Sequence, residues 1–534
     1  MLAAALCTAL FASAAMAVTD DASLRSEIAE GGTVTLENDI TIEDSEGAVQ
    51  VTKDVTLNLN GFTLKRNSSL NSHTFVIEVD GATLTIEDSI NGGGRIESFN
   101  SNYACARGIS VGSGAPDGSN PGNGGAVILK GGTISAEPNL DRMGYGIEVT
   151  ADCSVAQESQ TTASVTINNG AKIEAGYAGI FVQGKTAEVN IEGGEISAIA
   201  FGISGNGSTS GVNLGGTVIN INGGTITSEM GVGIFHPQDG TLTVNDGAIT
   251  GYDGIQMKSG TLVVNGGIIT GKGTNINDLT GTGNNDTGAA VSIISMGGAT
   301  GSYAGNMNVT FNGGTLISEQ ENAVFEAQAA DAVTKFESLT INGGTFTGAE
   351  GKSAVAMTNA SDENTTITAG TFSTKLADCE GLAGLTNLPQ TAKDENGNYY
   401  VVVNAESIAF ETNAIELAMN ETFTLRVIFT PDNTTEKALT WSSSDEKVAT
   451  VDTDGKITPV APGTATITAA LADNDSVYAT CTVTVTEEEA EPTPPVTSDD
   501  VKPQPSGSGG GGCSAGFGAL ALLAALPLLR MRKK

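Results

Sequence analysis

Hydrophobic and polar residues alternate in short runs along most of the chain, and these runs resemble one another. In LTVNDGAI (242–249), the leucine and the valine fall on one side of a strand, and the threonine and asparagine fall on the other. Asp246-Gly247 provides a turn with a positive φ, after which the isoleucine returns to the core. The run therefore predicts a half-buried strand, a tight turn and a second strand.

Copies of this run recur at short intervals. The turn glycines from Gly194 to Gly267 are separated by 30, 23 and 20 residues, which indicates a solenoid with occasional insertions. Several short strands per unit, with no helix between them, predict coils stacked about 4.8 Å apart in a parallel β-helix. The copies are VTLNLNGFTL (55–64), VILKGGTI (127–134), VNIEGGEI (189–196), VININGGTI (218–226), LVVNGGII (262–269), VTFNGGTL (309–316) and LTINGGTF (339–346).

The two ends of the repeat region carry further signals. DDASLRSEIAEGG (20–32) predicts a capping helix, with Leu24 and Ile28 on one face and glycines at its end. The segment after it, 32–64, resembles the first coils of the pectate-lyase-like right-handed β-helix superfamily, and GTFSTKLADCEGLAGLTNLPQTAKDENGNYYVV (370–402) resembles the last coil and cap of surface proteins of that group. The resemblance implies one β-helix domain over residues 18–403.

Glycine becomes rarer after residue 403, and alternating strands separated by turns predict a small β-sandwich over 404–486. WSSSDEKVATVDTDGKITPVAPGTATITA (441–469), followed by ATCTVTVT, resembles the bacterial Ig-like domain, group 2. Trp441 is the only tryptophan and is expected in the core, and Asp454-Gly455 is a favoured hairpin turn. The complete predicted fold class is thus all-β: a single-stranded right-handed parallel β-helix, an Ig-like β-sandwich, a disordered linker and a short C-terminal hydrophobic helix.

Residues 1–17 are apolar and end in Ala15-Met16-Ala17. Small residues in this A-x-A pattern are typical of signal-peptidase cleavage sites, and the run is too short for a membrane span. We expect a signal peptide that is cleaved after Ala17.

The C-terminal region predicts a linker and a sorting tail. Residues 487–512 are acidic, then rich in proline and glycine, and cannot bury enough apolar surface to fold. The tail 513–534 ends in an apolar run, which as a helix would cover roughly 22 Å of a ~30 Å hydrocarbon core, and in a basic cluster. It resembles the Synergist-type CTERM family of bacterial sorting domains, which implies a membrane sorting enzyme that acts on the tail at Cys513. An ordinary transmembrane anchor is the alternative.

Composition excludes one class of partner and leaves one cofactor open. The chain has 25 Lys and Arg against 61 Asp and Glu, a formal charge of −36, so the cations that bind nucleic-acid phosphates are scarce. Calcium could be held by Asp and Asn at turns, but neither an EF-hand-like loop nor a glycine-aspartate nonapeptide repeat is present. We expect no nucleic-acid partner and assign no cofactor, with Ca²⁺ as the only ion considered.

One stretch concentrates chemically distinctive residues. The candidate catalytic residues are His236, Asp239, Asp253 and Lys258; the only other histidine is His73. The paired carboxylate phrases of β-helix hydrolases are absent from the repeats, so paired acid and base groups cannot be assigned. The favoured interpretation is that these residues belong to turns and scaffold, with catalysis as the alternative.

Two inserts and four cysteines complete the candidates. The inserts 107–125 and 271–288 are rich in Asn, Asp, Gly and Ser, and are either recognition loops or tolerated insertions. Cys105, Cys153, Cys379 and Cys481 allow three disulfide pairings; Cys105 with Cys153 is one possibility, and buried free thiols are the other.

These signals predict an exported, surface-displayed bacterial protein, adhesin-like or structural, that contacts glycans, host surfaces or envelope components through its β-helix. The alternative is a β-helix polysaccharide lyase or glycoside hydrolase that acts on acidic polysaccharide. Convergent acidic and basic side chains on one face would favour the enzyme, an aromatic groove would favour glycan binding, and a Thr/Asn surface would favour a structural role. The oligomeric state is not predicted.

Overall fold

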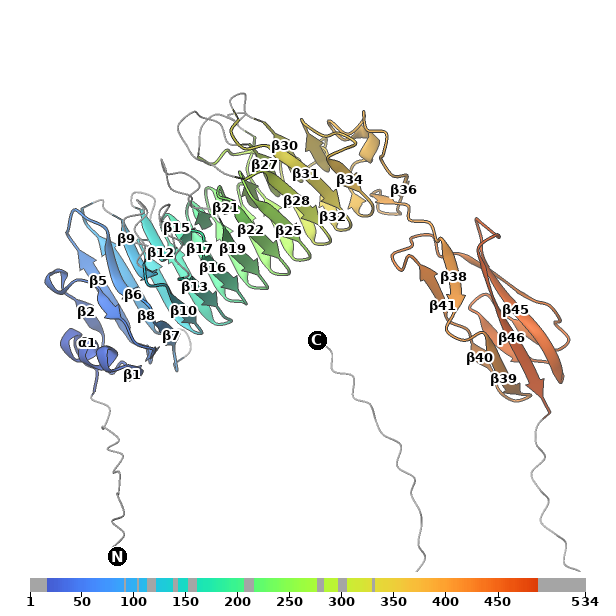
Figure 1. Cartoon of the computed structure of the whole chain (residues 1–534), viewed down its shortest axis with the longest axis horizontal. Coiled ribbons are helices and arrows are strands. Elements are labelled where there is room, and N and C mark those ends of the chain that lie inside the picture. Colours follow the sequence, from blue (N-terminus) through green and yellow to red (C-terminus); the bar gives the residue numbers. More distant parts are fainter. Residues whose placement is uncertain are drawn as a thin grey trace, which may run out of the picture.

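The computed structural model describes ten stretches of the chain, which together are all-β apart from short helices. Three long sheets run along a solenoid, and each coil of the chain adds one strand to each sheet (Figure 1). The predicted β-helix is therefore confirmed. The described stretches are 17–90, 93–102, 105–112, 122–137, 143–151, 161–205, 216–275, 283–295, 305–328 and 332–487.

The first sheet has twelve strands, all paired in parallel with the strand of the next coil. In order, they are β1 (Gly32–Thr35), β4 (Val55–Asn58), β7 (Thr83–Glu87), β10 (Gly125–Leu129), β13 (Ala163–Ile167), β16 (Ala187–Ile191), β19 (Thr217–Ile221), β22 (Gly240–Val244), β25 (Thr261–Val264), β28 (Met307–Phe311), β31 (Phe336–Ile341) and β34 (Thr365–Ile367).

The second sheet has twelve parallel strands and ends in an antiparallel hairpin of two more. In order, they are β2 (Ile40–Ile42), β5 (Thr63–Ser68), β8 (Arg95–Asn100), β11 (Gly132–Ala136), β14 (Ala171–Ala175), β17 (Glu195–Ala198), β20 (Thr225–Ser228), β23 (Ala248–Gly251), β26 (Ile268–Gly271), β29 (Thr315–Ser318), β32 (Thr345–Thr347), β35 (Thr371–Phe372), β37 (Tyr399–Val401) and β36 (Thr391–Lys393).

The third sheet has eleven strands. In order, they are β3 (Val49–Val51), β6 (Thr74–Val79), β9 (Ala106–Val111), β12 (Gly144–Thr150), β15 (Ala178–Gln183), β18 (Phe201–Gly205), β21 (Val232–His236), β24 (Ile255–Met257), β27 (Val291–Ile294), β30 (Val324–Ala327) and β33 (Val355–Met357). Single turns of 3-10 helix lie at Asp44–Glu46 and Leu376–Asp378.

Parallel register places like residues above one another and builds the core. In the first sheet, one buried position is aliphatic in coil after coil, and each of these side chains is fully buried. The ladder runs Val189, Ile219, Leu242, Leu262, Val309 and Leu339. Equivalent positions of the sequence repeat therefore pair with one another in the sheet. The core is built from small aliphatic side chains, because the composition offers few aromatic ones.

The Gly-Ile phrase of the repeat forms a bend where the chain enters the third sheet. A Cβ on Gly233 would lie 2.8 Å from Cγ2 of Ile249, and one on Gly254 would lie 2.6 Å from Cγ2 of Ile269. Only glycine fits this close approach of the third sheet to the isoleucines of the second. The residue before each glycine is placed outside the main core.

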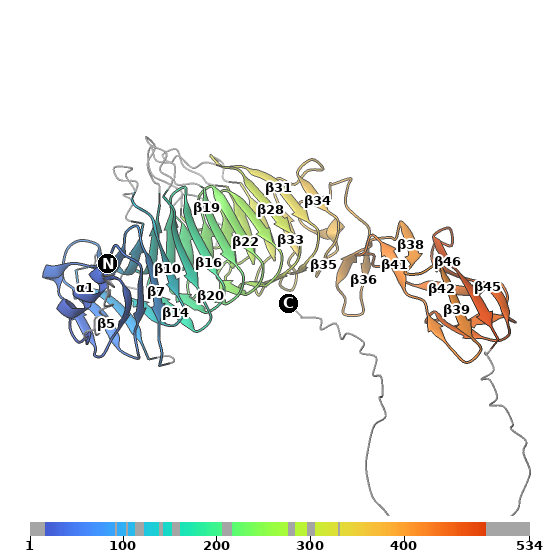
Figure 2. The same cartoon turned by 60° about the horizontal axis from the view of Figure 1, so that its bottom comes forward.

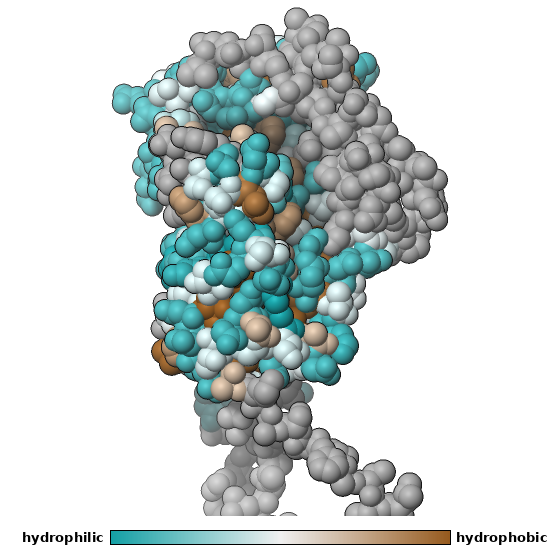
Figure 3. Space-filling view, turned by 90° about the vertical axis from the view of Figure 1, so that its left-hand side faces the viewer, coloured by the Kyte–Doolittle hydropathy of each residue, from teal (hydrophilic) through white to brown (hydrophobic). Residues whose placement is uncertain are grey.

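The N-terminal end of the solenoid is closed by α1 (Asp21–Glu30), as predicted. Asp20 caps the helix, because its side chain accepts the Ser23 N–H at 2.9 Å while the Ser23 hydroxyl bonds back to the cap. Leu24 and Ile28 are buried against the first coils. Seen from this end, the surface is mostly hydrophilic with scattered apolar patches (Figure 3), as expected where the open edge of a β-helix is covered.

The Ig-like part has three antiparallel or mixed sheets, and two views show it beyond the β36–β37 end of the solenoid (Figures 1 and 2). Trp441 is half-buried and stacks on Phe410 at 5.7 Å between ring centroids, so it lines the core without being enclosed by it. The Asp454-Gly455 turn has a φ of 78° at the glycine and joins β44 to β43, as predicted. The sheets are β38 (Ser407–Phe410) with β41 (Val427–Thr430); β39 (Ala414–Ala418), β46 (Tyr478–Thr486), β45 (Gly463–Leu471) and β42 (Leu439–Ser443); and β40 (Phe423–Thr424), β44 (Lys456–Pro459) and β43 (Ala449–Val451).

Several predictions fall outside the described residues: the signal peptide before Ala17, the linker after residue 487, Cys513 with the sorting tail, and Cys153. Within the described residues, no helix has the length and apolar character needed to cross a membrane. Cys105, Cys379 and Cys481 are buried free thiols.

Candidate functional site

Long connections of the chain begin or end at strands of the third sheet. The first and second sheets are joined by short turns such as 221–225, whereas the connections 205–217, 271–291 and 294–307 all enter or leave the third sheet. Loops on a rigid scaffold are where binding residues concentrate. The outer face of the third sheet is therefore the first place to look for a site.

Asp253 lies on this face and anchors the end of the insert 271–288. Its Oδ1 accepts the backbone N–H groups of Thr287 and Gly288 at 2.9 and 2.8 Å. Its Oδ2 accepts from the Thr287 and Ser292 hydroxyls at 2.8 and 2.5 Å and from the Gln256 amide at 2.8 Å. Burial raises the pKa of Asp253 to about 6, although these hydrogen bonds act in the opposite direction. The carboxyl group is saturated by the protein itself.

Lys258 belongs to the same network. It is fully buried, and its ammonium donates to Oδ1 of Asn285, whose own N–H donates to Gln256 Oε1 at 2.8 Å. Burial lowers the pKa of Lys258 to about 8, opposed by the negative charge of Asp253. Two of the four candidate residues, Asp253 and Lys258, thus belong to one hydrogen-bonded network around residues 285–288 of the insert.

His236 and Asp239 lie apart from this network. His236 is fully buried, and its Nδ1 is 3.1 Å from the Ser259 carbonyl oxygen, so Nδ1 carries the proton. Its Nε2 is buried with no hydrogen-bond partner, and burial lowers the pKa of His236 to about 4. Asp239 is exposed and accepts the Gly240 N–H at 3.0 Å. The structure places none of the four candidates in an accessible acid and base pair.

An ion pair and two rings form a second cluster nearer the N-terminus, which the sequence analysis missed. Arg107 Nε lies 2.6 Å from Glu148 Oε2. The guanidinium carbon lies 5.1 Å from the Phe75 ring centroid and 5.3 Å from that of Tyr145. Burial raises the pKa of the Glu148 carboxyl, and the positive charge of Arg107 opposes this shift. His73 is exposed close by, and its pKa is lowered by partial burial and by the charge of Arg107.

A row of five aromatic rings continues from this pair along the sheet. Tyr145 is 5.3 Å from both Tyr177 and Phe181, Tyr177 is 5.3 Å from Phe201, and Phe201 is 5.4 Å from Phe235, between ring centroids. The row forms a cluster separate from the solenoid core, which is typical of satellite clusters beneath long loops. Three of its rings are buried, while Tyr177 and Phe181 are half-buried. We call Arg107, Glu148 and these five rings the aromatic row site.

Several polar groups of the aromatic row site make no hydrogen bond to other described residues. Among the described residues, the Arg107 side chain makes no hydrogen bond through its terminal nitrogens, and the Tyr145 and Tyr177 hydroxyls make none. Burial raises the pKa of both phenols, so they stay protonated and can donate. The site combines ring faces with hydrogen-bond donors. The signal for it in the sequence was the residue before each Gly-Ile phrase, since Tyr145 and Phe201 occupy this position.

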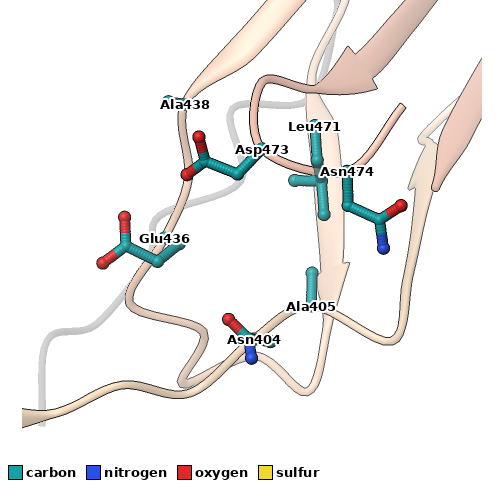
Figure 4. A pocket seen from close by; sticks show the side chains of 7 residues that line it. All are labelled: Asn404, Ala405, Glu436, Ala438, Leu471, Asp473 and Asn474. Carbon is teal, nitrogen blue, oxygen red and sulfur yellow. The ribbon is translucent and has the colours of Figure 1, made fainter. Parts of the chain in front are cut away.

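A cavity of about 230 Å³ lies in the Ig-like part (Figure 4). Glu436 and Asp473 place carboxylates on one side of it, across from Leu471. The Tyr400 hydroxyl, from the β37 hairpin, donates to Glu436 at 3.3 Å, so this edge joins the solenoid cap to the sandwich. Among the described residues, no three His, Cys, Asp or Glu side chains gather closely enough to hold a metal ion.

The comparisons with known proteins concern this C-terminal part. Residues 404–483 match the bacterial Ig-like domain (group 2). A lacto-N-biosidase of Bifidobacterium bifidum is 40% identical over 80 residues, 15% of this chain and 7% of the relative. A 3-O-alpha-D-galactosyl-alpha-L-arabinofuranosidase of Bifidobacterium longum is 43% identical over 75 residues, 14% and 6% of the two chains. An uncharacterized protein of Clostridium acetobutylicum is 46% identical over 77 residues, 14% and 8%.

This chain therefore spans less than a tenth of the length of each of these three relatives. The similarity to the glycosidases lies in the Ig-like region. It concerns this domain alone and carries no catalytic residue to the solenoid.

Proposed function

We propose that this protein is exported, displayed at the cell surface, and binds glycans through the aromatic row site. The single observation that carries the proposal is the row of rings beside Arg107 on the outer face of the third sheet. Sugars present apolar C–H faces and many hydroxyls, so a site for them needs ring faces together with a few fixed donors. Tyr177 and Arg107 supply both within one cluster.

Display outside the cell is supported by the overall organisation. The Ig-like domain occurs here and in glycosidases that, by their names, act on glycans. We assign it the role of a spacer between the solenoid and the acidic linker 487–512, with the tail at Cys513 as the substrate of a membrane sorting enzyme. Mass spectrometry of the protein from its native host tests this part: the mature chain should begin at Val18 and lack the residues after the processed tail position. A chain that retains both ends would contradict it.

Cleavage of an acidic polysaccharide is the second candidate function. The observation that favours it is Glu148, a carboxyl group with a raised pKa, 2.6 Å from Arg107 on one face of the solenoid. A raised pKa suits a general acid. Against this function, each of the two charged groups already engages the other.

One experiment separates the two functions. Purified protein is tested for binding to immobilised neutral and acidic polysaccharides, while product size and unsaturated-end absorbance report cleavage, with and without Ca²⁺. We expect binding without cleavage, and a loss of about tenfold in affinity for Tyr177→Ala. Thr250→Ala, on the outer face of the second sheet, is the matched control and should bind like wild type. Cleavage that is abolished by Glu148→Gln would establish the enzyme instead; no binding to any glycan would refute both.

A further inference from the structure

A separate polar cleft of about 600 Å³ opens on the same face near the C-terminal end of the solenoid. Its base is Phe325, an outward and half-buried residue of β30. Its walls come from the start of the insert, the turn before β30, and the two following turns. A volume of this size is in the range of small-molecule sites.

Two of the wall residues are fixed by their own hydrogen bonds. Glu321 forms an ion pair with Lys352 at 2.5 Å, and its other oxygen accepts the Asn275 N–H at 3.3 Å. Asn322 Oδ1 accepts the Ser353 N–H at 2.8 Å. The amide oxygen is thus committed, and no acceptor for the amide NH₂ group of Asn322 is found among the described residues.

Three polar groups of the cleft are therefore available among the described residues: the Asn322 NH₂ group, the remaining N–H donors of Lys352, and the carboxylate of Glu380. Asn322 is largely buried at 9% exposure, whereas Lys352 and Glu380 are exposed at the rim. Two donor groups and one acceptor beside the Phe325 ring match a ligand whose own ring carries neighbouring hydroxyls. Each hydroxyl can both donate and accept a hydrogen bond.

The charge of the cleft is also defined by these residues. Lys352 is paired with Glu321, and Glu380 has no ion-pair partner in the part of the chain that the structure describes. An acidic ligand would meet this carboxylate with no cation left uncommitted. The charge of the cleft therefore disfavours an acidic ligand, and its donors and acceptor fit the hydroxyls of a neutral one.

The Asp253 network positions one wall of the cleft. Asp253 holds the Gly288 N–H at 2.8 Å, and the Gly288 carbonyl accepts from Ser318 at 2.6 Å, three residues before Glu321. A Cβ on Gly288 would lie 2.8 Å from Cγ of Glu321, so the insert packs directly on this wall. The buried carboxylate that the sequence singled out is thus a positioning residue for the cleft.

We infer that the cleft lined by Phe325, Asn322, Lys352 and Glu380 is a binding site for a neutral mono- or disaccharide unit. The inference rests on the proposed function, because it assigns a second site and a ligand class to the same glycan-binding face. The two sites use different residues: the aromatic row site ends at Phe235 in β21, and the cleft is built on β30.

Calorimetric titration of the purified protein with lactose, N,N′-diacetylchitobiose and an arabinobiose tests the inference, with digalacturonic acid as the acidic counterpart. We expect at least one neutral disaccharide to bind and the acid not to bind. Phe325→Ala should weaken binding about tenfold or more, and Glu380→Gln should weaken it without unfolding the protein. Glu395→Gln, an exposed carboxylate in the β36–β37 hairpin, is the matched control and should bind like wild type.

Long-chain glycan binding by the same variants distinguishes the failures. If Tyr177→Ala loses the long glycan while wild type binds no neutral disaccharide, the cleft inference is overturned and the proposed function stands. The cleft inference is also overturned if wild type and Glu380→Gln bind the disaccharide equally and Phe325→Ala does so too. The Phe325→Ala result counts only if that variant keeps its thermal midpoint. If neither probe binds to wild type, both proposals are wrong.

Discussion

At the residue scale, the most unusual side chains of the chain are structural supports. Asp253, Lys258 and His236 are all fully buried, although charged and imidazole groups are rarely enclosed unless they are paired. The carboxylate and the ammonium are satisfied by the insert, which explains why burial is tolerated. Their value lies in fixing a loop to the solenoid.

Replacing Asp253 should therefore destabilise the protein strongly. In Asp253→Asn, an NH₂ group would face donors that now point at a carboxylate oxygen, and we expect a loss of about 2–4 kcal/mol in the free energy of unfolding. Asp239→Asn is the matched control on the exposed neighbour and should stay within about 0.5 kcal/mol of wild type. Equal effects of the two changes in urea denaturation would contradict the network.

His236 should make stability depend on pH. Its pKa is about 4 in the folded protein, below its ordinary value of 6.5, so the unfolded chain binds more protons between these values. Stability from this residue is present above pH 6.5 and is lost as the pH falls toward 4. Between pH 6.5 and pH 4, the free energy of unfolding of wild type should fall by about 3 kcal/mol relative to that of His236→Gln.

Asp253 opposes this dependence in wild type, because its raised pKa favours the folded state as the pH falls through 6. The difference between wild type and His236→Gln isolates the histidine, since both retain Asp253. A difference in unfolding free energy that is constant from pH 7 to pH 4 would show that His236 is not buried as described.

The sequence identified these residues but could not assign their role. The residue types and their places in neighbouring coils were visible in the repeat. The partners Thr287 and Gly288, in contrast, come from an insert that follows no sequence period. The aromatic row was missed for a related reason. Its register depends on the bend at glycines such as Gly146, which places Tyr145 outside the core although it alternates in phase with buried Ile147.

At the element scale, the fold was predictable because one pattern specifies every coil. Alternation predicted the strands, and the glycine turns predicted their ends. The capping signals at Asp20 or Asp21 and at Gly31-Gly32 predicted α1, and the structure assigns the caps to Asp20 and Gly31. A further element forms at the turns after the first sheet, where asparagine side chains bond to one another from coil to coil. This ladder joins Asn222, Asn245, Asn265, Asn312 and Asn342, with N–O distances of 2.7 to 3.0 Å.

Breaking one rung tests the ladder. Asn265 donates to Asn245 at 2.7 Å and its oxygen accepts from Asn312 at 2.9 Å, so Asn265→Ala removes two hydrogen bonds. We expect a loss of about 1–2 kcal/mol in the free energy of unfolding. Thr270→Ala, an outward residue of β26 in the same coil, is the control, and a loss no larger than in this control would argue against a stabilising ladder.

At the scale of the whole molecule, the solenoid is a rod with covered ends. The side chains on the outer face of its third sheet vary from coil to coil. The first and second sheets carry repeated Thr and Asn outside, and the third carries the rings, the inserts and the cleft. Parallel edges are open to pairing with other chains, so the N-terminal helix also protects the molecule from association.

Removal of the cap should expose this edge. A protein that begins at Gly32 lacks α1 and the buried Leu24 and Ile28, and its first strand β1 has an unpaired edge. We expect oligomers or aggregates in size-exclusion chromatography with light scattering, whereas the protein that begins at Val18 keeps its smaller size. A truncated chain that matches the size distribution of the longer one would contradict the capping role.

The central claim is that glycans bind to the outer face of the third sheet. Hydrogen–deuterium exchange of the purified protein, with and without a glycan that it retains, tests this claim most directly. We predict slower exchange in peptides that contain β9, β12 and β15 and in the turns around Phe325, with no change in the second sheet or the Ig-like domain. Protection confined to the second sheet or to residues 404–483 would contradict the account.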